Sequence, residues 1–357
     1  MNRFRVMIIS GLFILFFMKY SATWYTFSGE TMGTTYSIKV KVPRYLPREK
    51  VETKIDAIFS SYTATFSTYD PKSELSNLNI INRTSPIEIS EDLFEMLLIG
   101  KSVYKQTNGA WDGSVYPLVK LWNLYAFQAD YSEDGVIPSP SDISDTLHVI
   151  GYDKFIVYRD QYNYMFKKDR SGFKIDLSSI VKGATVDRVA QYLQSVTSDF
   201  MVEIGGEVYA AGKNEKHANW KFGVKHPLYK DGDSFPLLIS TVELDGTGMA
   251  TSGDYERYHV VDGKRYSHIL DPRTGYPVSH GVLSVTVVSP STAYSDGLAT
   301  ALMVLSYEEG RTLIDRLDAV TAYWVVDSGD KNDALGIRVY ESDNWENELP
   351  SESDDSD

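Results

Sequence analysis

Residues Ala250–Val278 read ATSGDYERYHVVDGKRYSHILDPRTGYPV, and no other part of the chain is as informative about the fold. Two β-type runs, Tyr255–Val261 and Tyr266–Leu270, flank an Asp-Gly-Lys turn, which predicts a β-hairpin. The turn DPRTG, residues 271–275, follows at once and consists of residues that favour tight turns. His268 ends the second run, where such a turn would hold its side chain still.

The same stretch is unusually rich in polar groups that can do chemistry. A plain surface hairpin does not need so many of them, and polar groups fixed on a hairpin and a turn are typical of a functional site. The set comprises Thr251, Ser252, Asp254, His268, Asp271 and Arg273.

Composition limits the class of protein. The chain has 357 residues, enough for one large domain or two smaller ones, and its hydrophobic fraction of 43% is that of an ordinary globular protein. A net charge of −14 argues against nucleic-acid binding, because phosphate backbones require a basic surface. The absence of cysteine excludes disulfides, thiolate metal sites and cysteine nucleophiles.

The two ends of the chain differ from the middle. Arg3 and Arg5 precede the apolar run Val6–Met18, so residues 1–24 are predicted to be a signal sequence or an uncleaved signal-anchor. We therefore expect an exported protein, in the periplasm or at the outer face of the inner membrane. Residues 341–357 contain eight acids and no Lys or Arg, which predicts a disordered acidic tail.

Periodicity predicts both strands and helices in the remaining chain. Thr35–Val42 alternates like a strand, whereas Arg48–Ser61 and Glu91–Thr107 have helical spacing, the latter stopped by Asn108-Gly109. Because the elements do not alternate as regular βαβ units, the fold class is α+β. Further strands are predicted at Lys154–Val157, Tyr162–Lys168, Val202–Val208, Phe222–Val224, Leu237–Val242, Val282–Val288 and Ala322–Val326, and further helices at Asp187–Ser195, Ala293–Leu305 and from a Ser141 cap to about Val149.

The polar stretch resembles the signature of the FAD:protein FMN transferase family (ApbE family). ATSGDY at 250–255 and SHILDPRTGYP at 267–277 carry this likeness. Six more clusters resemble other motifs of the family, so the likeness runs from about residue 28 to 330. They are ETMGTTY at 30–36, FSTYD at 66–70 with Ser73 and Ser76, GAWD at 109–112, DLSSIVKG at 176–183, EIGGE at 203–207 and DGLATAL at 296–302.

The resemblance implies one flavin-transferase domain over residues 25–340, with mixed or antiparallel sheets, flanking helices and FAD in a central cleft. It implies transfer of FMN from FAD to a threonine, or sometimes a serine, of an exported acceptor protein of a flavin-dependent electron-transfer complex, with release of AMP. Bacterial members are often lipoproteins, but this chain lacks the cysteine that lipidation needs. The FAD contacts that the resemblance implies are Met32, Tyr69, Ala110, Trp111, Asp112, Asp176, Lys182, His268 and Ile269.

A magnesium site is predicted next to the FAD diphosphate. Asp296 and Thr300 are four residues apart on a predicted helix, so their oxygens share one face. Mg²⁺ prefers about six oxygen ligands, few of them from protein. The resemblance assigns a third ligand to Ser179, in an expected tight turn ahead of a helix. Lys182-Gly183, in the same segment, resembles phosphate-binding turns.

The sequence leaves the identity of the general base undecided. A histidine with a pKa of about 6.5 suits proton transfer, so His268 acts either as the base or as the group that orients the acceptor hydroxyl. Asp254, Asp271 and Asp296 are the alternatives. Two other functions use the same motifs: an FAD pyrophosphatase, in which water replaces the acceptor hydroxyl, and a flavin-binding protein without turnover.

Overall fold

The computed structural model describes residues 21–123, 137–230, 233, 236–253, 258–261, 264–267, 269–330, 333, 335–343 and 345. Several predictions fall outside this set. They concern most of the N-terminal segment, the Asp262-Gly263 turn, Asp254, His268 and the acidic residues after 345.

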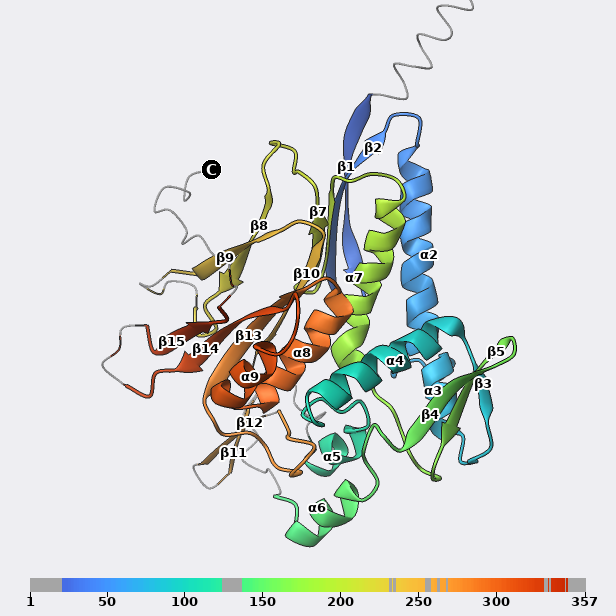
Figure 1. The fold of residues 1–357 in the computed structure, drawn as a ribbon, viewed down its shortest axis with the longest axis vertical. Coiled ribbons are helices and arrows are strands. Elements are labelled where there is room, and N and C mark those ends of the chain that lie inside the picture. The colour runs from blue at the N-terminus through green and yellow to red at the C-terminus, as the bar shows by residue number, and fades with distance from the viewer. Residues whose placement is uncertain are drawn as a thin grey trace, which may run out of the picture.

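An eight-stranded antiparallel sheet forms the centre of the molecule (Figure 1). The α+β class, with antiparallel sheets in one domain, is therefore confirmed. In spatial order the strands are β1 (Ala22–Thr31), β2 (Thr34–Pro43), β6 (Phe200–Ile204), β7 (Glu207–Ala211), β10 (Thr247–Gly253), β13 (Val282–Ser289), β14 (Thr321–Asp327) and β15 (Ile337–Glu341).

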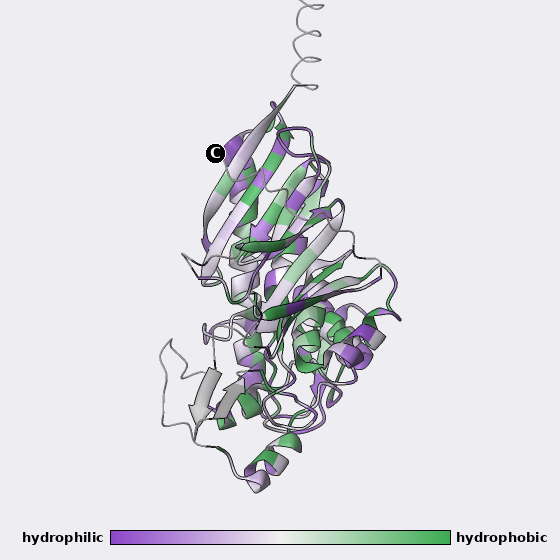
Figure 2. Cartoon of the chain, turned by 90° about the vertical axis from the view of Figure 1, so that its left-hand side faces the viewer, coloured by the Kyte–Doolittle hydropathy of each residue, from purple (hydrophilic) through white to green (hydrophobic). Residues whose placement is uncertain are grey.

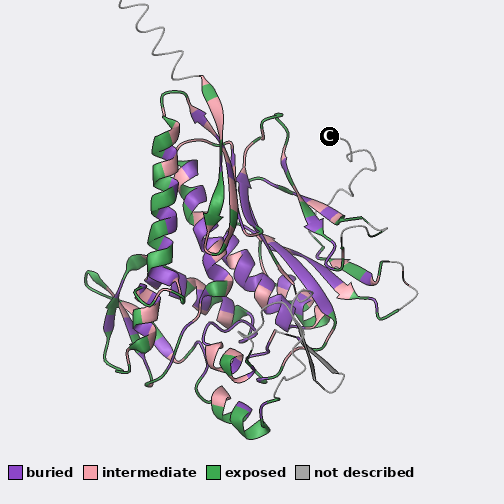
Figure 3. Ribbon diagram, turned by 180° about the vertical axis from the view of Figure 1, so that it is seen from behind, coloured by how far each residue is buried: buried purple, intermediate pink, exposed green. Residues whose placement is uncertain are grey.

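Both faces of this sheet are covered, which explains why its central strands are so apolar. Helices α7 (Ser178–Gln194) and α8 (Thr292–Val304) pack on one face, and the hairpin of β8 (Trp220–Lys225) and β9 (Leu238–Leu244) covers the other. Successive side chains of a strand point to opposite faces. In β14, Trp324 accordingly joins the core under the helices, while Tyr323 and Val325 join the core under the hairpin. Figure 3 shows these strands as almost uniformly buried.

The remaining elements surround the sheet and its two helices. Hydropathy follows this layering, with hydrophobic residues concentrated along the strands and hydrophilic ones at the periphery (Figure 2). These elements are α2 (Arg48–Phe66), α3 (Glu74–Ile80), α4 (Glu91–Gln106), α5 (Tyr116–Leu121), α6 (Pro140–Leu147), α9 (Tyr307–Ile314), the sheet of β3 (Ile87–Ile89), β5 (Asn163–Lys168) and β4 (Phe155–Asp160), and the hairpin of β11 (Tyr258–Val261) and β12 (Lys264–Ser267).

Two sequence predictions near the centre were wrong in their boundaries. Helix α7 begins at Ser178, nine residues before the predicted start at Asp187, so Lys182-Gly183 lies inside the helix and not ahead of it. The helix is buried on several sides, which hides the amphipathic period that marks a surface helix. The single strand predicted at Val202–Val208 is the hairpin β6–β7, turned by Gly205 and Gly206 at φ 61° and 99°.

Other differences are smaller. Helix α6 is capped by Ser139 and not by Ser141, because the Ser139 hydroxyl accepts the N–H of Asp142. The sequence did not predict several elements that are short or lack a clear pattern of apolar and polar residues. They are β1, β3, β10, β15, α3, α5 and α9. Beyond β15, Trp345 is buried against Tyr323 with ring centroids 5.4 Å apart, inside the stretch predicted as a tail. Within the part of the chain that the structure describes, no helix is long and apolar enough to span a bilayer.

Helices α7 and α8 leave no room for a side chain at Gly183. A Cβ on Gly183 would lie 2.4 Å from the carbonyl oxygen of Thr292. Backbone cannot move aside as a flexible side chain can, so Gly183→Ala is expected to lower the free energy of unfolding by about 1–3 kcal/mol. Urea denaturation measures this, with Gln191→Ala on the exposed face of α7 as the control. Equal stability of the two variants would contradict this packing.

Candidate active site

A cleft of about 850 Å³ opens where four segments meet: the β1–β2 turn, the end of α2, the loop that follows it and the first turns of α7. It unites Met32, Tyr69 and Lys182, three of the residues expected to contact FAD. They are far apart in sequence, so only the fold brings them together. The lining residues are Met32, Gly33, Thr34, Thr63, Phe66, Ser67, Thr68, Tyr69, Ser178, Val181 and Lys182.

Met32 occupies a conformation that few side chains adopt. Met32 and Gly33 form the β1–β2 turn with φ 52° and 76°, the left-handed pair that tight hairpins require. The Met32 sulfur accepts the Thr185 hydroxyl at 3.4 Å, which ties the turn to α7. The turn therefore presents the thioether at the cleft in a set position.

Tyr69 stands at the edge of the cleft, and its side chain is 90% exposed. The loop below it is built by the serines of the FSTYD motif. The Ser67 hydroxyl accepts the N–H groups of Tyr69 and Asp70, and the Ser67 carbonyl accepts the hydroxyls of Ser73 and Ser76. The hydrogen bonds of these serines fix the conformation of the loop, and the loop carries the exposed Tyr69.

The segment Ala110–Asp112, which the resemblance implies as an FAD contact, is buried. The Trp111 indole is 2% exposed and packs edge-on against Tyr152, so it offers no open face for stacking on a flavin ring. Its Nε1 instead donates to the Ser179 hydroxyl at 2.8 Å. Trp111 thus orients a residue of the predicted metal site.

Asp112 has a structural partner of its own. Its carboxylate accepts the N–H and the hydroxyl of Ser114 at 2.7 and 2.6 Å. Burial raises the pKa of Asp112 to about 6, although both bonds from Ser114 oppose the shift.

Asp112 should therefore make folding stability depend on pH. Its folded pKa lies above the unfolded value of about 3.9, so stability falls as pH rises between about 4 and 6. Asp112→Asn removes this penalty, and we expect the variant to gain about 2–3 kcal/mol relative to wild type between pH 4 and pH 7. Urea denaturation across this range tests the prediction, with the exposed Asp145→Asn as control. Parallel pH profiles of wild type and Asp112→Asn would contradict it.

Helix α8 carries the two other predicted metal ligands. Asp296 is 5% exposed, and its Oδ2 accepts the Gly183 N–H at 3.2 Å. One helical turn on, the Thr300 hydroxyl lies 3.5 Å from the Ser252 hydroxyl. Gly183 contacts Thr292, whereas Ile180 contacts Gly297, so the two helices run in opposite directions. The first turn of α7, with Ser179, therefore lies level with the Asp296–Thr300 turn of α8.

An ion pair joins the cleft to a buried carboxylate. Lys182 Nζ is 2.7 Å from Glu207 Oε1, and the Glu207 side chain is only 3% exposed. Burial raises the pKa of Asp296 well above its ordinary value, and the Glu207 carboxylate raises it further. The Lys182 ammonium thus acts on two buried carboxyl groups: it pairs with Glu207 and favours the charged form of Asp296. Glu207 follows the Gly205-Gly206 turn, but nothing in its local sequence indicated this contact.

These residues fit a hard divalent cation. One carboxylate and two hydroxyls, from Asp296, Thr300 and Ser179, are the oxygen donors that Mg²⁺ prefers. The single ammonium leaves a deficit of positive charge that a cation would offset. Among the described residues no three His, Asp or Glu side chains gather, so phosphate and water would supply the remaining ligands.

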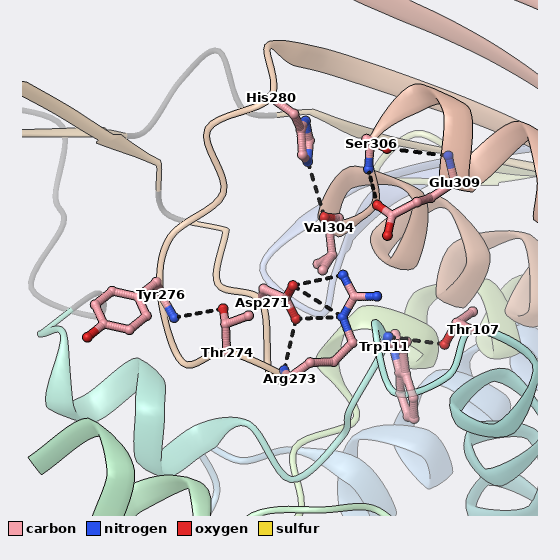
Figure 4. Close-up of polar contacts among 10 residues, drawn as sticks. All are labelled: Thr107, Trp111, Asp271, Arg273, Thr274, Tyr276, His280, Val304, Ser306 and Glu309. Atoms are coloured by element: carbon pink, nitrogen blue, oxygen red, sulfur yellow. Dashed lines mark hydrogen bonds and ion pairs between the residues drawn. The ribbon is translucent and has the colours of Figure 1, made fainter. Parts of the chain in front are cut away.

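The turn after His268 is firmly built, although His268 itself lies outside the described residues. The Ser267 hydroxyl accepts the Ile269 N–H, and the Ile269 carbonyl accepts the Val278 N–H. Arg273 donates to both carboxylate oxygens of Asp271, as Figure 4 shows. Because this pairing occupies the Asp271 carboxylate, Asp271 is a poor candidate for the general base.

Asp176 and Asp187 have capping roles. Asp176 Oδ1 accepts the N–H of Ser178 at the start of α7. The Asp187 carboxylate accepts the N–H groups of Thr292 and Ala293 and the hydroxyl of Ser291, so it caps α8 from α7. The DLSSIVKG motif and its following aspartate therefore hold α7 and α8 in register beneath the cleft.

Comparison with known proteins identifies the family. The ApbE family profile matches residues 32–324. The chain belongs to the ApbE family. An FAD:protein FMN transferase of Haemophilus influenzae is 35% identical over 293 residues, which are 81% of this chain and 83% of that protein. One from Vibrio cholerae is 36% identical over 290 residues, with the same two shares.

Solved structures agree with this membership. The apo crystal structure of the Pseudomonas stutzeri flavinyl transferase ApbE superposes with a TM-score of 0.75 at 30% identity, covering 91% of this chain and 96% of that one. The flavin transferase ApbE from Vibrio cholerae has a TM-score of 0.73 at 32% identity, covering 90% of this chain and 98% of that one. The ApbE fold thus extends over almost the whole described chain.

Proposed function

We propose that this protein is an Mg²⁺-dependent FAD:protein FMN transferase, which attaches FMN through a phosphoester bond to a threonine or serine of an acceptor protein and releases AMP. The chain belongs to the ApbE family, and one further observation supports the proposed function most strongly. Met32, Tyr69 and Lys182 line one cleft, and the oxygens of Asp296 and Thr300 lie on the helix packed against its floor.

The reaction is a displacement at phosphorus. The acceptor hydroxyl oxygen forms a bond to the FMN-side phosphorus of FAD, the bond from that phosphorus to the bridging oxygen breaks, and AMP leaves with the electron pair. The hydroxyl proton passes to a base, for which we propose His268. Mg²⁺ bound by Ser179, Asp296 and Thr300 would neutralise charge on the diphosphate and on the leaving AMP.

The chain's own residues contribute positioning and electrostatics. Lys182 places an ammonium at the cleft, where it can contact a phosphate. Met32 and Tyr69 present a thioether and a ring at the same cleft, suited to the flat parts of FAD. Backbone groups of Ala110–Asp112 and Ile269, with Asp176, complete the proposed FAD contacts.

An assay with three readouts tests the function. The protein is incubated with FAD, MgCl₂ and a purified acceptor domain, and then with the same domain whose acceptor threonine is replaced by valine. We expect fluorescent labelling of the first domain only, together with one AMP for each FMN attached. Free FMN with AMP and no labelling would identify a pyrophosphatase instead, and unchanged FAD would identify a binding protein.

Export to the periplasmic side is proposed from the N-terminal sequence. Arg3, Arg5 and the apolar run Val6–Met18 support a signal sequence or signal-anchor. The flavin transferase domain would then occupy residues 25–340, followed by the acidic segment 341–357. Cell fractionation with N-terminal sequencing of the mature protein tests location and cleavage together, and a cytoplasmic protein that starts at Met1 would contradict export.

A further inference from the structure

Glu207 is a buried charged group that the proposed chemistry leaves unused. It begins β7 directly after the Gly205-Gly206 turn, and the residue is 2% exposed. Its Oε1 accepts from Lys182 at 2.7 Å, while its Oε2 is buried without a hydrogen-bond partner among the described residues. A buried carboxylate costs free energy unless a partner offsets the loss of hydration, and here the ion pair engages only one of the two oxygens.

Lys182 has three carboxylates within its electrostatic reach, those of Glu207, Asp296 and Glu203. Burial alone would lower the pKa of the Lys182 ammonium, but the Glu207 and Asp296 carboxylates outweigh burial and raise it. Among the described residues, Lys182 makes its ion pair with Glu207 and not with Asp296. Asp296 has the neighbouring Gly183 N–H as its hydrogen-bond donor.

We propose that Glu207 is a positioning residue that holds the Lys182 ammonium at the cleft and away from Asp296, so that the Asp296 carboxylate stays open to a divalent cation. The inference rests on the proposed function of this site. Without the Glu207 charge, the buried carboxylate that still acts on Lys182 is that of Asp296, because Glu203 is only half-buried. An ammonium paired there would compete with Mg²⁺ for the same oxygens and would leave the diphosphate contact.

Two substitutions together separate this role from simple structural support. Glu207→Gln keeps the shape of the side chain and removes its charge, so Lys182 is free to pair with Asp296. We expect Mn²⁺, used as a probe for Mg²⁺, to bind this variant at least about tenfold more weakly than wild type. The double variant Lys182→Met, Glu207→Gln has no competing ammonium, and its Mn²⁺ affinity is expected to return to within about threefold of wild type.

The measurements do not require turnover. Electron paramagnetic resonance of free Mn²⁺ gives the metal affinity without FAD, and flavin fluorescence quenching gives the FAD affinity. FAD binding should weaken in both variants, because both lose the lysine at the diphosphate. Glu203→Gln is the matched control: it removes a charge that also acts on Lys182 from the same β6–β7 hairpin. The Glu203 side chain bonds the Gly206 N–H, however, and forms no ion pair with Lys182 among the described residues.

Each outcome decides the inference. Wild-type Mn²⁺ affinity in Glu207→Gln, or weak binding that the double variant does not restore, would overturn it. Wild type that binds no Mn²⁺ would also overturn it. FMN transfer, assayed on the same preparations, keeps the two claims apart: a wild type that transfers FMN while Glu207→Gln binds Mn²⁺ normally overturns only the role of Glu207. No transfer by wild type, with the expected metal affinities, overturns only the proposed function.

Discussion

Replacing Asp296 with alanine is expected to lower the rate of Mg²⁺-dependent FMN transfer by about a thousandfold or more. Asp296 supplies the only carboxylate of the proposed metal site, and its position on α8 is held by the Gly183 N–H. The affinity for FAD should fall much less, by less than about tenfold, because Met32, Tyr69 and Lys182 still line the cleft. Initial rates over a range of MgCl₂ concentrations and flavin fluorescence quenching measure the two effects.

Two controls make this result specific. Asp145→Ala removes an exposed acid from α6 and should leave transfer unchanged. Thermal unfolding of the Asp296→Ala protein shows whether the fold survives the loss of the buried carboxyl group. An Asp296→Ala protein that is folded and transfers FMN at the wild-type rate would remove Asp296 from the metal site.

Replacing His268 with alanine is expected to lower FMN transfer by about a hundredfold to ten-thousandfold, the usual contribution of a positioned general base. His268 is favoured as the base partly because two other candidates are engaged elsewhere. Both Asp271 oxygens accept from Arg273, and Asp296 is assigned to the metal, so two of the three alternative bases are already engaged. A wild-type rate that falls below a pH of about 6.5 should become flat over this range in the variant.

The matched control is His148→Ala, which removes an exposed histidine from the end of α6. Added imidazole should restore part of the activity of His268→Ala if the lost group transfers a proton. A variant that labels the acceptor at nearly the wild-type rate would place the base elsewhere, with Asp254 as the remaining candidate.

Local sequence was sufficient wherever neighbouring residues determine the structure. The hydrophobic spacing of Val51, Ile55 and Ile58 predicted helix α2, and the Asn108-Gly109 stop predicted the end of α4, where both residues have positive φ. The β11–β12 hairpin and the α+β class were predicted correctly for the same reason. Strand alternation, helical spacing and turn residues act over a few positions, and they can be read without knowing what packs above them.

Local sequence was insufficient where an element is buried on several sides, because such an element has no polar face to contrast with its apolar face. The start of helix α7 was predicted nine residues too late, because Ile180, Val181 and Ala184 are buried together with residues of its other faces. Trp111 illustrates the same limit for a side chain. The family motif implied that it contacts FAD, and its sequence gave no sign that the fold buries the indole and directs its N–H to Ser179.

By itself, the sequence determined the family and the fold class, because the motifs keep special-turn and charged residues in register over most of the chain. Only the tertiary structure decided which of these residues meet. It placed Met32, Tyr69 and Lys182 around one cleft, and it set Glu207 against Lys182 across 25 positions of sequence. Such contacts depend on how the sheet and two helices pack, and packing is a property of distant residues acting together.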